Sequence, residues 1–529
     1  MESNQLKSKD YTVAFLTVLG LIGGVALLLR TRSGIGISTD SVQYIMAARN
    51  LLTGHGLCTL SSSGEAVHMT HFPPLFPYLL AAIGMGGMDP LIAARWLNVC
   101  LFGANILLIG FMINKYYRSP WMSIFGSFLM LSSTGMLQIH SMAWSEPLFI
   151  FFGFLGLLIL ASYLQNPKLT LLFASSGAIS LAFLSRYAGL PFVITGIVGI
   201  LFLSTEKYKG KIVHSVIFGI ISCLPLGLWV IRNSYLTGKA TNRNLVFHPI
   251  TINHIEYALS NVSIWLFPPR IPLALRVIFL VATFLGFFVL GAVVMKRKAR
   301  QNPNVCTKQY LSKIPLLLVA FILTYVGFLT VSISLFDVYI RIDNRLLSPV
   351  YVSAVVIVLS LLQKLLGLTE RQRAFKVGVV LICVVLSGLY LHRSIKWFID
   401  NNDYREGYTN YADKSWVQSE IIRKVSSLPP STPIYTNGQD AIYIRTGKHS
   451  FEIPKKVYPV DGVVNHSYSS QLTSMQERLE NQNGVLVYFN TLTYLRPYLP
   501  SEDELKEELP LNLVERGDDG SIYTVGSKK

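Results

Sequence analysis

Asp40 is a carboxylic acid that stands shortly after the first long apolar run of the chain, residues 11–30. A carboxylate in this position can accept a proton from a hydroxyl group, and partial burial would raise its pKa towards neutral pH, where a base works well. The residue also has a structural interpretation. Asp40 followed by Gln43 resembles a capping box that would start a helix over 41–52. Both interpretations stay open, because a helix cap can also carry chemistry.

Glu146 is a second acid next to an apolar run, in the sequence Ser145-Glu146-Pro147. Ser145 can cap a helix, and an acid followed by proline in the first turn suits the helix dipole. The helix it would open covers residues 146–165 and is apolar enough to cross a membrane. A charge there is costly unless it faces water or a partner, so Glu146 is also a candidate functional residue.

A third cluster of charged residues lies between Asp337 and Pro349 and includes Arg341, Asp343 and Arg345. Asp337 and Arg341 are four residues apart, as are Arg341 and Arg345, so they would share one face if this segment were helical. One interpretation is an interfacial salt-bridge network, or arginines that extend towards lipid headgroups. The other is a phosphate clamp, because guanidinium groups bind phosphate oxygens bidentately.

The composition shows which elements must position these residues. Of 529 residues, 51% are hydrophobic and 14% are charged, and the mean hydropathy is +0.45. Soluble domains carry roughly 25% charged residues, so this is a helical, multi-pass membrane protein. The net charge of +17 could suggest a nucleic-acid partner, but the basic residues are spread over short loops, which indicates membrane orientation instead.

Eleven apolar runs are long enough to predict membrane spans, at about 17–25 residues each. They lie near residues 11–30, 91–114, 120–138, 146–165, 169–185, 189–204, 212–231, 273–295, 314–336, 346–366 and 375–394. The runs 169–185 and 189–204 are marginal in length. The first run has no clear cleavage site and is interpreted as an uncleaved signal anchor.

The segment 73–88 decides the topology. If it lies along the membrane surface, the loops rich in lysine and arginine all fall on the cytoplasmic side with the N-terminus, as the positive-inside rule requires. If it crosses, the same loops face outward. We therefore predict a cytoplasmic N-terminus in the plasma membrane. The candidate residues then share the outer side; they are Asp40, His71, Glu146, Arg186, Arg341, Asp343 and Arg345.

Residues 397–529 differ in character from the rest. They hold 18 of the 29 acidic residues and no run long enough to span. Segments 433–438 and 484–489 have the pattern of buried strands, and 469–482 has the pattern of a helix. Asp413 is a plausible cap for a further helix. The predicted domains are thus a membrane domain over 1–396, with an outer loop 31–90, and a small extracytoplasmic α/β domain over 397–529, reached through the polar linker 400–404.

Several motifs resemble those of the GT-C glycosyltransferases, and most closely the protein mannosyltransferase and aminoarabinose transferase branch. They are Asp40-Ser41-Val42-Gln43-Tyr44, Pro73-Pro74-Leu75-Phe76-Pro77, Ser145-Glu146-Pro147-Leu148-Phe149 and Arg345-Leu346-Leu347-Ser348-Pro349. Together they cover residues 10–395 in the order and on the side that the family would have. The resemblance implies an inverting enzyme that moves a sugar from a polyprenyl-phosphate donor to an acceptor hydroxyl on a lipid, glycan or protein.

The resemblance also implies roles for individual residues. Asp40 would accept the proton from the acceptor hydroxyl, and Glu146 would position the acceptor. Arg345, with Arg341, would hold the donor phosphate. His71, Asp343 and Arg186 are further candidates. His71 could be a base, but next to Phe72 it is equally well explained as an interfacial anchor.

The chain departs from the family pattern in two places. Ser41 follows Asp40 where the mannosyltransferases carry a second acid, and His71-Phe72-Pro73-Pro74 replaces the Lys-Pro-Pro of many relatives. The five cysteines are scattered and form no metal motif. No metal site is predicted. A Mg or Mn ion stays open, because a hard cation can take some of its oxygen ligands from water.

Two other classes of protein stay open as alternatives. A transporter or flippase of lipid-linked sugars would also need a basic cavity, but it would more often have paired repeats and broken helices, and the sequence has neither. A non-catalytic subunit of cell-envelope assembly would use residues 397–529 for docking. Release of free polyprenyl phosphate from a labelled donor distinguishes the enzyme from both.

Overall fold

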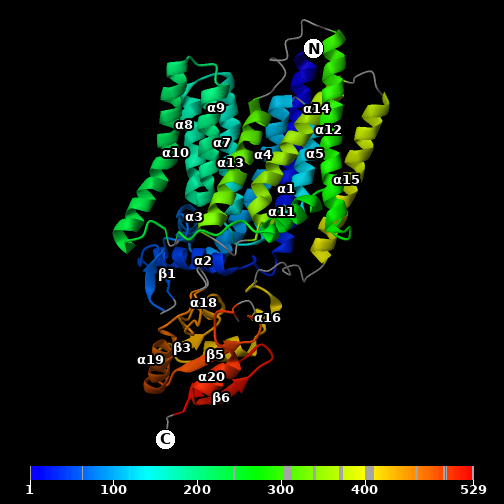
Figure 1. Cartoon of the computed structure of the whole chain (residues 1–529). Coiled ribbons are helices and arrows are strands. Elements are labelled where there is room, and N and C mark those ends of the chain that lie inside the picture. The colour runs from blue at the N-terminus through cyan, green and yellow to red at the C-terminus, as the bar shows by residue number, and fades with distance from the viewer. Residues whose placement is uncertain are drawn as a thin grey trace. The chain divides into compact units, whose positions relative to one another are not determined.

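The structure is a computed structural model of the whole chain (Figure 1). It describes all residues except 1, 62–63, 118, 242–244, 302–312, 337–340, 369–372, 400–409, 459–462, 493–494, 496 and 527–529. Asp337 of the third charged cluster and the predicted linker 400–404 lie outside the described residues.

Contacts between residues divide the chain into two compact units. The helical unit consists of Met1–Arg32, His71–Phe76 and Arg95–Asn401, and the mixed unit of Ser33–Thr70, Pro77–Ala94 and Asn402–Lys529. Most of the outer loop 31–90 therefore packs with the C-terminal residues, whereas the sequence predicts that this loop belongs to the membrane domain. This pairing joins segments more than 300 residues apart in sequence, so no local pattern could predict it.

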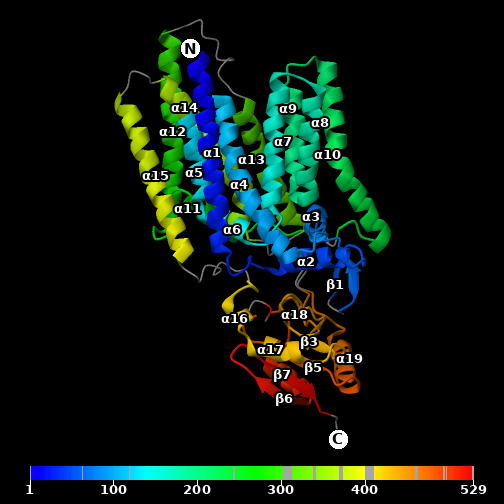
Figure 2. The same ribbon diagram turned by 180° about the vertical axis from the view of Figure 1, so that it is seen from behind.

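Mostly apolar helices, many of them long, build the helical unit. They are α1 (Glu2–Arg30), α4 (Pro90–Tyr117), α5 (Pro120–Leu131), α6 (Thr134–Ser141), α7 (Glu146–Gln165), α8 (Leu169–Ser185), η1 (Tyr187–Gly189), α9 (Leu190–Leu203), α10 (Tyr208–Thr237), α11 (Ile252–Ile264), α12 (Leu273–Gln301), α13 (Lys313–Leu335), α14 (Asn344–Leu368) and α15 (Arg373–Ile399). Helices α7–α10 and α13 form one group, and α1, α5, α12, α14 and α15 form another (Figures 1 and 2).

The described helices confirm a multi-pass membrane protein. Seven of them are long and apolar enough to cross a bilayer alone, and α5 with α6 makes an eighth candidate. The predicted total of eleven also needs the shorter apolar helices 169–185, 187–203 and 273–286, so that number stays a prediction. Helix α3 (Leu75–Gly84) has 10 residues. At about 1.5 Å per residue it spans about 15 Å, half the thickness of the hydrocarbon core, and is too short to cross.

The predicted span 120–138 is not one straight helix. Helices α5 and α6 meet at an angle of 56°. Ser132 and Ser133 form the break: Ser132 ends α5, and the Ser133 hydroxyl accepts a hydrogen bond of 3.4 Å from the backbone N–H of Met136 as the cap of α6. Serine competes for backbone hydrogen bonds in this way and favours helix ends. The α6 helix lies at the same end of the helical unit as α11 (Figure 2).

The mixed unit is an α/β structure, as predicted for its C-terminal part. Its helices are α2 (Thr39–Leu52), α16 (Lys414–Val417), α17 (Glu420–Ser427), α18 (Gln439–Thr446), α19 (Tyr468–Asn481) and α20 (Glu502–Glu508), with most of α3. Its strands are β1 (Cys58–Leu60), β2 (Ala66–His68), β3 (Ile434–Thr436), β4 (Phe451–Glu452), β5 (Val485–Phe489), β6 (Leu511–Arg516) and β7 (Gly520–Val525). Ser419 caps α17 with its side chain, whereas Asp413 precedes α16 without such a bond.

The main sheet of the mixed unit has the order β4-β3-β5-β7-β6. Strand β3 runs parallel to β4 and β5, and β7 runs antiparallel to β5 and β6. The predicted strands 433–438 and 484–489 and the helix 469–482 correspond to β3, β5 and α19. Leu472, Met475 and Leu479 of α19 pack on Leu486 and Tyr488 of β5, which explains why both segments have such regular apolar patterns.

Candidate functional site

Three of the predicted site residues meet in the helical unit. Glu146 opens α7, Arg345 lies in the first turn of α14, and Arg186 joins α8 to η1. Arg345 Nε donates a hydrogen bond to Glu146 Oε1, and Arg186 Nη1 lies 2.5 Å from the same oxygen. Arg345 therefore meets a glutamate 199 positions before it in the sequence and shares its Oε1 with Arg186. We call Glu146, Arg186 and Arg345 the arginine–glutamate cluster.

The arginine–glutamate cluster is almost closed to water. Glu146 is 2% exposed, and the side chains of Arg186 and Arg345 are 20% and 10% exposed. The Arg345 guanidinium also lies over the Trp144 ring, 4.1 Å from its centroid, which favours the cation. Two guanidinium groups share one carboxylate, and the charge of Asp343 acts on the same Tyr325 hydroxyl as these three charges. Guanidinium groups held in a low-dielectric site bind phosphate oxygens strongly.

A buried polar network supports the segment that carries Glu146. Asn98 Nδ2 donates to the carbonyl of Met142 at 2.6 Å, and Asn105 Nδ2 donates to the carbonyl of Pro147 at 3.1 Å. Asn105 Nδ2 also lies 3.1 Å from His140 Nε2, whose other ring nitrogen is 2.7 Å from the carbonyl of Met136. These contacts assign the proton of a neutral imidazole to Nδ1. The network fixes both ends of the segment 142–147, which leads from the end of α6 into the first turn of α7.

Sequence reasoning missed this network, although a signal for it was present. Asn98 and Asn105 are seven residues apart in the apolar run 91–114, which places both on one face of α4. Two amides on one face of a membrane helix must find partners there. His140 lies just beyond the predicted span 120–138, and one histidine there gives no pattern.

Arg341 does not share a face with Arg345, as the four-residue spacing had suggested. Helix α14 starts only at Asn344, so Arg341 precedes it in an extended segment. Its guanidinium is exposed and lies 5.5 Å from the Tyr257 ring of α11. Asp343 acts as the cap of α14, because its Oδ1 accepts a hydrogen bond of 3.0 Å from the backbone N–H of Leu346. His71 packs edge-on against Phe72, with 4.6 Å between ring centroids.

Asp40 belongs to the mixed unit, and its interpretation as a helix cap is wrong. Helix α2 starts at Thr39, and its cap is Ser38. Ser38 and Ser41 form the capping box reciprocally: the backbone N–H of Ser38 donates to Ser41 Oγ at 3.1 Å, and that of Ser41 donates to Ser38 Oγ at 3.5 Å. Short hydroxyl side chains at these two positions satisfy the helix start. The carboxylate of Asp40 is therefore not needed as a cap, although its place in the first turn suits the helix dipole.

Asp40 has other carboxylates near it within the mixed unit. Burial, followed by the negative charges of Glu452 and Asp40, raises the pKa of Asp440 to about 7. Asp440 lies in the first turn of α18, which packs on α2. Gln439 of the same helix donates to the carbonyl of Ser61 at 3.0 Å. We call Asp40, Asp440 and Glu452 the carboxylate group. Sequence reasoning missed Asp440, since nothing in its local sequence indicates that α18 would meet α2.

No protein-family model matches the chain, and no curated protein matches it by sequence. Solved structures do match. The archaeal oligosaccharyltransferase AglB from Archaeoglobus fulgidus, in complex with an inhibitory peptide and a dolichol-phosphate, has a TM-score of 0.54 and 13% identity, over 98% of this chain and 75% of that one. The apo form of the A. fulgidus oligosaccharyltransferase has a TM-score of 0.51 and 12% identity over the same shares. The chain has the GT-C fold.

The GT-C fold confirms the resemblance found in the sequence motifs. A third similar structure is ArnT from Cupriavidus metallidurans in the apo state, with a TM-score of 0.49, 12% identity and 98% of each chain covered. At such low identity these likenesses concern the fold alone. The chemistry of the GT-C chain described here must come from its own residues, and the arginine–glutamate cluster and the carboxylate group are the two places that offer it.

Neither of these places fits a metal ion well. Within the described ranges, no three His, Cys, Asp or Glu side chains gather where they could hold a cation together. Glu146 is a poor ligand, because two guanidinium groups already share its Oε1. A hard cation takes six or more oxygen ligands, and a carboxylate between two arginines repels a third cation. We therefore derive no step through a metal ion.

Proposed function

We propose that the protein is a glycosyltransferase that moves a sugar from a polyprenyl-phosphate donor to an acceptor hydroxyl group. One observation carries this proposal: in a chain with the GT-C fold, a single glutamate holds two largely buried arginines side by side. The two guanidinium groups would bind the phosphate of the donor. The AglB structure, of the same fold, contains a dolichol-phosphate, which agrees with a lipid-linked phosphate as the ligand.

In the proposed reaction, an oxygen of the acceptor forms a bond to the anomeric carbon of the sugar, while the bond from that carbon to the donor phosphate oxygen breaks. The electron pair of the broken bond stays on the phosphate. Arg345 and Arg186 stabilise that charge where it develops, which is the most effective use of fixed charges in an enzyme. Attack opposite the leaving group inverts the anomeric centre.

The remaining candidates have supporting roles in this proposal. Asp40 accepts the proton that the acceptor hydroxyl loses. Glu146 keeps both arginines oriented, and the buried amides of Asn98 and Asn105 hold the segment that carries it in place. Arg341, which lies in an exposed segment, stays a candidate ligand of the same phosphate. His71 stays a candidate for a second polar contact. Asp343 is explained by its hydrogen bond to the start of α14.

The proposed location is the outer face of the plasma membrane, with a cytoplasmic N-terminus. Two features support it: the basic loops fall on one side, and α3 is too short to reverse that order. The proposed donor sugar is a hexose or a pentose. The proposed acceptor is a lipid, a glycan or a protein.

The decisive experiment uses the purified full chain in detergent or nanodiscs. The protein is incubated with a panel of labelled polyprenyl-phosphate hexoses and pentoses, together with membrane extracts as acceptors. We expect free polyprenyl phosphate and a labelled acceptor, and loss of both products in Arg345→Gln. Arg232→Gln, a change on α10 away from the cluster, is the matched control and should retain activity. A flippase would instead move a donor across a vesicle membrane and release no polyprenyl phosphate, and that result would overturn the proposal.

A further inference from the structure

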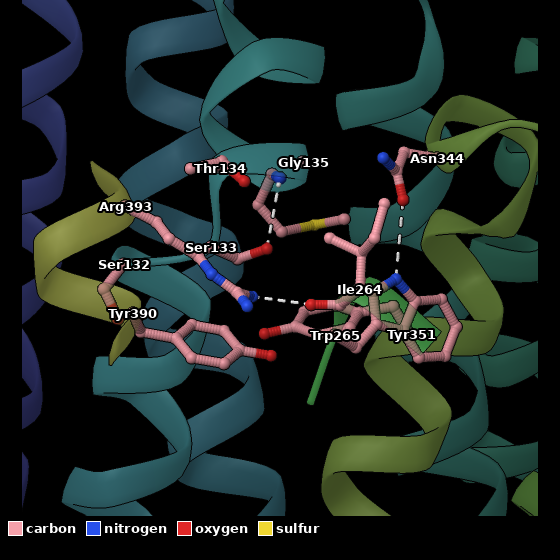
Figure 3. A pocket seen from close by; sticks show the side chains of 11 residues that line it. Ser132, Ser133, Thr134, Gly135, Ile264, Trp265, Asn344, Tyr351, Tyr390 and Arg393 are labelled. Carbon is pink, nitrogen blue, oxygen red and sulfur yellow. Dashed lines mark hydrogen bonds between the residues drawn. The ribbon is translucent and has the colours of Figure 1, made fainter. Parts of the chain in front are cut away.

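A second polar cavity lies in the helical unit, outside the arginine–glutamate cluster. Its cavity volume is about 30 Å³, and it is partly open to solvent. Its walls come from the break between α5 and α6, the C-terminal end of α11, the start of α14 and the last part of α15 (Figure 3). We call it the α15 cavity. Polar side chains dominate its lining, which is unusual for a gap between apolar membrane helices.

Arg393 of α15 points its guanidinium into the α15 cavity (Figure 3). Nη1 donates a hydrogen bond of 2.6 Å to the carbonyl of Ile264 at the end of α11. That contact has a structural explanation, because a cation suits the C-terminus of a helix. It uses only part of the guanidinium, however. Nη2 is buried and has no hydrogen-bond partner among the described residues.

Arg393 also lacks a counter-charge. No acidic side chain in the described parts of the chain forms an ion pair with it, whereas Arg186 and Arg345 share Glu146. A cation at membrane depth is costly unless it meets water or an anion, and a buried donor without an acceptor costs free energy. These features are expected of an arginine whose counter-ion is a bound ligand and not an acidic side chain.

Other polar groups surround the same space. The hydroxyls of Tyr390 and Ser133 line the cavity near the guanidinium, and both also hydrogen-bond with the Tyr351 hydroxyl (Figure 3). Thr134 and Gly135, at the start of α6, also line it, and the first backbone N–H groups of a helix have no partner within that helix. Fixed N–H and hydroxyl donors around one guanidinium match the several acceptor oxygens of a phosphate group.

We infer that the α15 cavity binds a phosphate group, on a lipid headgroup or as a free ion, at a site separate from the arginine–glutamate cluster. Asn344 lines the cavity, while the next residue, Arg345, is engaged with Glu146. Consecutive residues of a helix point about 100° apart, so the first turn of α14 separates the two sites. The inference rests on the residues of the cavity and holds whether or not the protein transfers a sugar.

The test measures binding to the full-length protein in detergent by equilibrium dialysis. Two probes are used in parallel, radiolabelled inorganic phosphate and radiolabelled farnesyl monophosphate. We expect Arg393→Gln to weaken the binding of at least one probe by tenfold or more, as befits the loss of a charged donor. Arg393→Lys should restore part of the affinity. Arg345→Gln should leave the binding of inorganic phosphate and the Arg393-dependent part of the farnesyl monophosphate binding in place, which separates the cavity from the proposed catalytic cluster.

The two probes identify the source of the phosphate. Binding of farnesyl monophosphate alone assigns a lipid headgroup, and equal binding of both shows that the phosphate group is sufficient. Unchanged binding of both probes in Arg393→Gln, or no binding of either by the wild type, would overturn the inference.

Arg393→Gln could also unfold the protein, since Arg393 holds the end of α11. Tyr390→Phe and Ser133→Ala therefore serve as a second pair, because each removes one hydroxyl and leaves the charge. We expect each to weaken binding of the same probe about threefold to tenfold. Wild-type affinity in both variants would count against a phosphate in this cavity. The matched control is Arg232→Gln, whose guanidinium lies over Trp229 and does not line the cavity.

Discussion

The acidic residues Glu146 and Asp440, one in each unit, lie in opposite electrostatic environments. In the helical unit, Glu146 is buried between two arginines, so its negative charge is matched and held. In the mixed unit, Asp440 lies near Asp40 and Glu452, and burial together with these like charges raises the pKa of Asp440 to about 7. A carboxylate between arginines is suited to fixed charge. A carboxylate among other carboxylates is suited to proton exchange near neutral pH.

Under the proposed function, this difference matches separate tasks for the two groups of residues. The arginine–glutamate cluster is proposed to bind and stabilise a phosphate, and Asp40 of the carboxylate group is proposed to accept a proton. The division agrees with the general rule that environments which favour different protonation states identify the acid–base groups of an enzyme. Each half of the division can be broken by a single substitution.

The largest effect is expected from removal of the base. Asp40→Asn leaves the shape of the side chain nearly unchanged but cannot accept a proton. Loss of a general base typically lowers turnover by about 10²–10⁴-fold. Expression and melting temperature should stay close to wild type, because Ser38 and Ser41 cap α2 without help from Asp40. Initial rates with a labelled donor measure the effect. Turnover equal to wild type would remove Asp40, and with it the carboxylate group, from the chemistry.

The second test breaks the charge match in the helical unit. Glu146→Gln leaves Arg186 and Arg345 buried without a carboxylate, and breaking a buried ion pair costs about 3–5 kcal/mol. A clear fall in melting temperature in detergent, with loss of transfer activity, is the expected result. Glu256→Gln is the matched control, since Glu256 is exposed on α11. The double change Glu146→Gln with Arg186→Gln should recover part of the stability. No recovery would mean that the carboxylate acts on something other than the arginines.

The third test titrates the carboxylate group. Asp440 has a raised pKa in the folded state, so the folded protein binds more protons than the unfolded chain between about pH 4 and pH 7. Its contribution to stability is therefore most favourable below about pH 4 and is lost as the pH rises to about 7. The full shift corresponds to roughly 4 kcal/mol; because the side chain is partly exposed, about half of that is expected.

Asp440→Asn removes this dependence on pH. Melting temperatures of the full-length protein, measured from pH 5 to pH 8, should fall less steeply in the variant than in the wild type. At pH 8 the variant should be the more stable by about 1–2 kcal/mol, after the loss of a small favourable term at the start of α18. Asp503→Asn, an exposed change on α20, is the control. Parallel curves for wild type and Asp440→Asn would show that the carboxylate group does not exchange a proton in this range.

The sequence predicts one side of this comparison better than the other. Apolar runs identify the membrane helices because burial in lipid imposes length and composition on each helix separately. The same applies to α19, whose apolar period reflects a single buried face, and to β5, whose continuous apolar run reflects burial of the whole strand. Glu146 and Arg345 could be identified as candidates from their positions beside apolar runs. Their shared oxygen could not, because it depends on how α7 and α14 pack.

The mixed unit was less predictable for a physical reason. Its first part, residues 33–70 and 77–94, is separated from residues 402–529 by most of the chain, and the charges that act on Asp440 come from both parts. The raised pKa of Asp440 is a property of α18 packed on α2, and neither helix shows it alone. The choice of Ser38 over Asp40 as the cap was also hidden, since serine and aspartate are about equally good caps.

The smallest effect tests whether the fixed charge of the helical unit also needs a fixed position. Asn98→Ala removes the hydrogen bond of 2.6 Å to the carbonyl of Met142, and the loss of one such bond costs about 1 kcal/mol. If segment 142–147 must be held for Glu146 to orient the arginines, the transfer rate should fall several-fold while the melting temperature changes little.

The control is Asn166→Ala, at the exposed far end of α7, which should alter neither the transfer rate nor the melting temperature. A fall in the melting temperature of Asn98→Ala with an unchanged transfer rate would mean that the amide network stabilises the fold and leaves the arginine–glutamate cluster undisturbed. Because the carboxylate group lies in the other unit, the pH dependence of the rate should stay as in wild type, which separates loss of position from loss of the base.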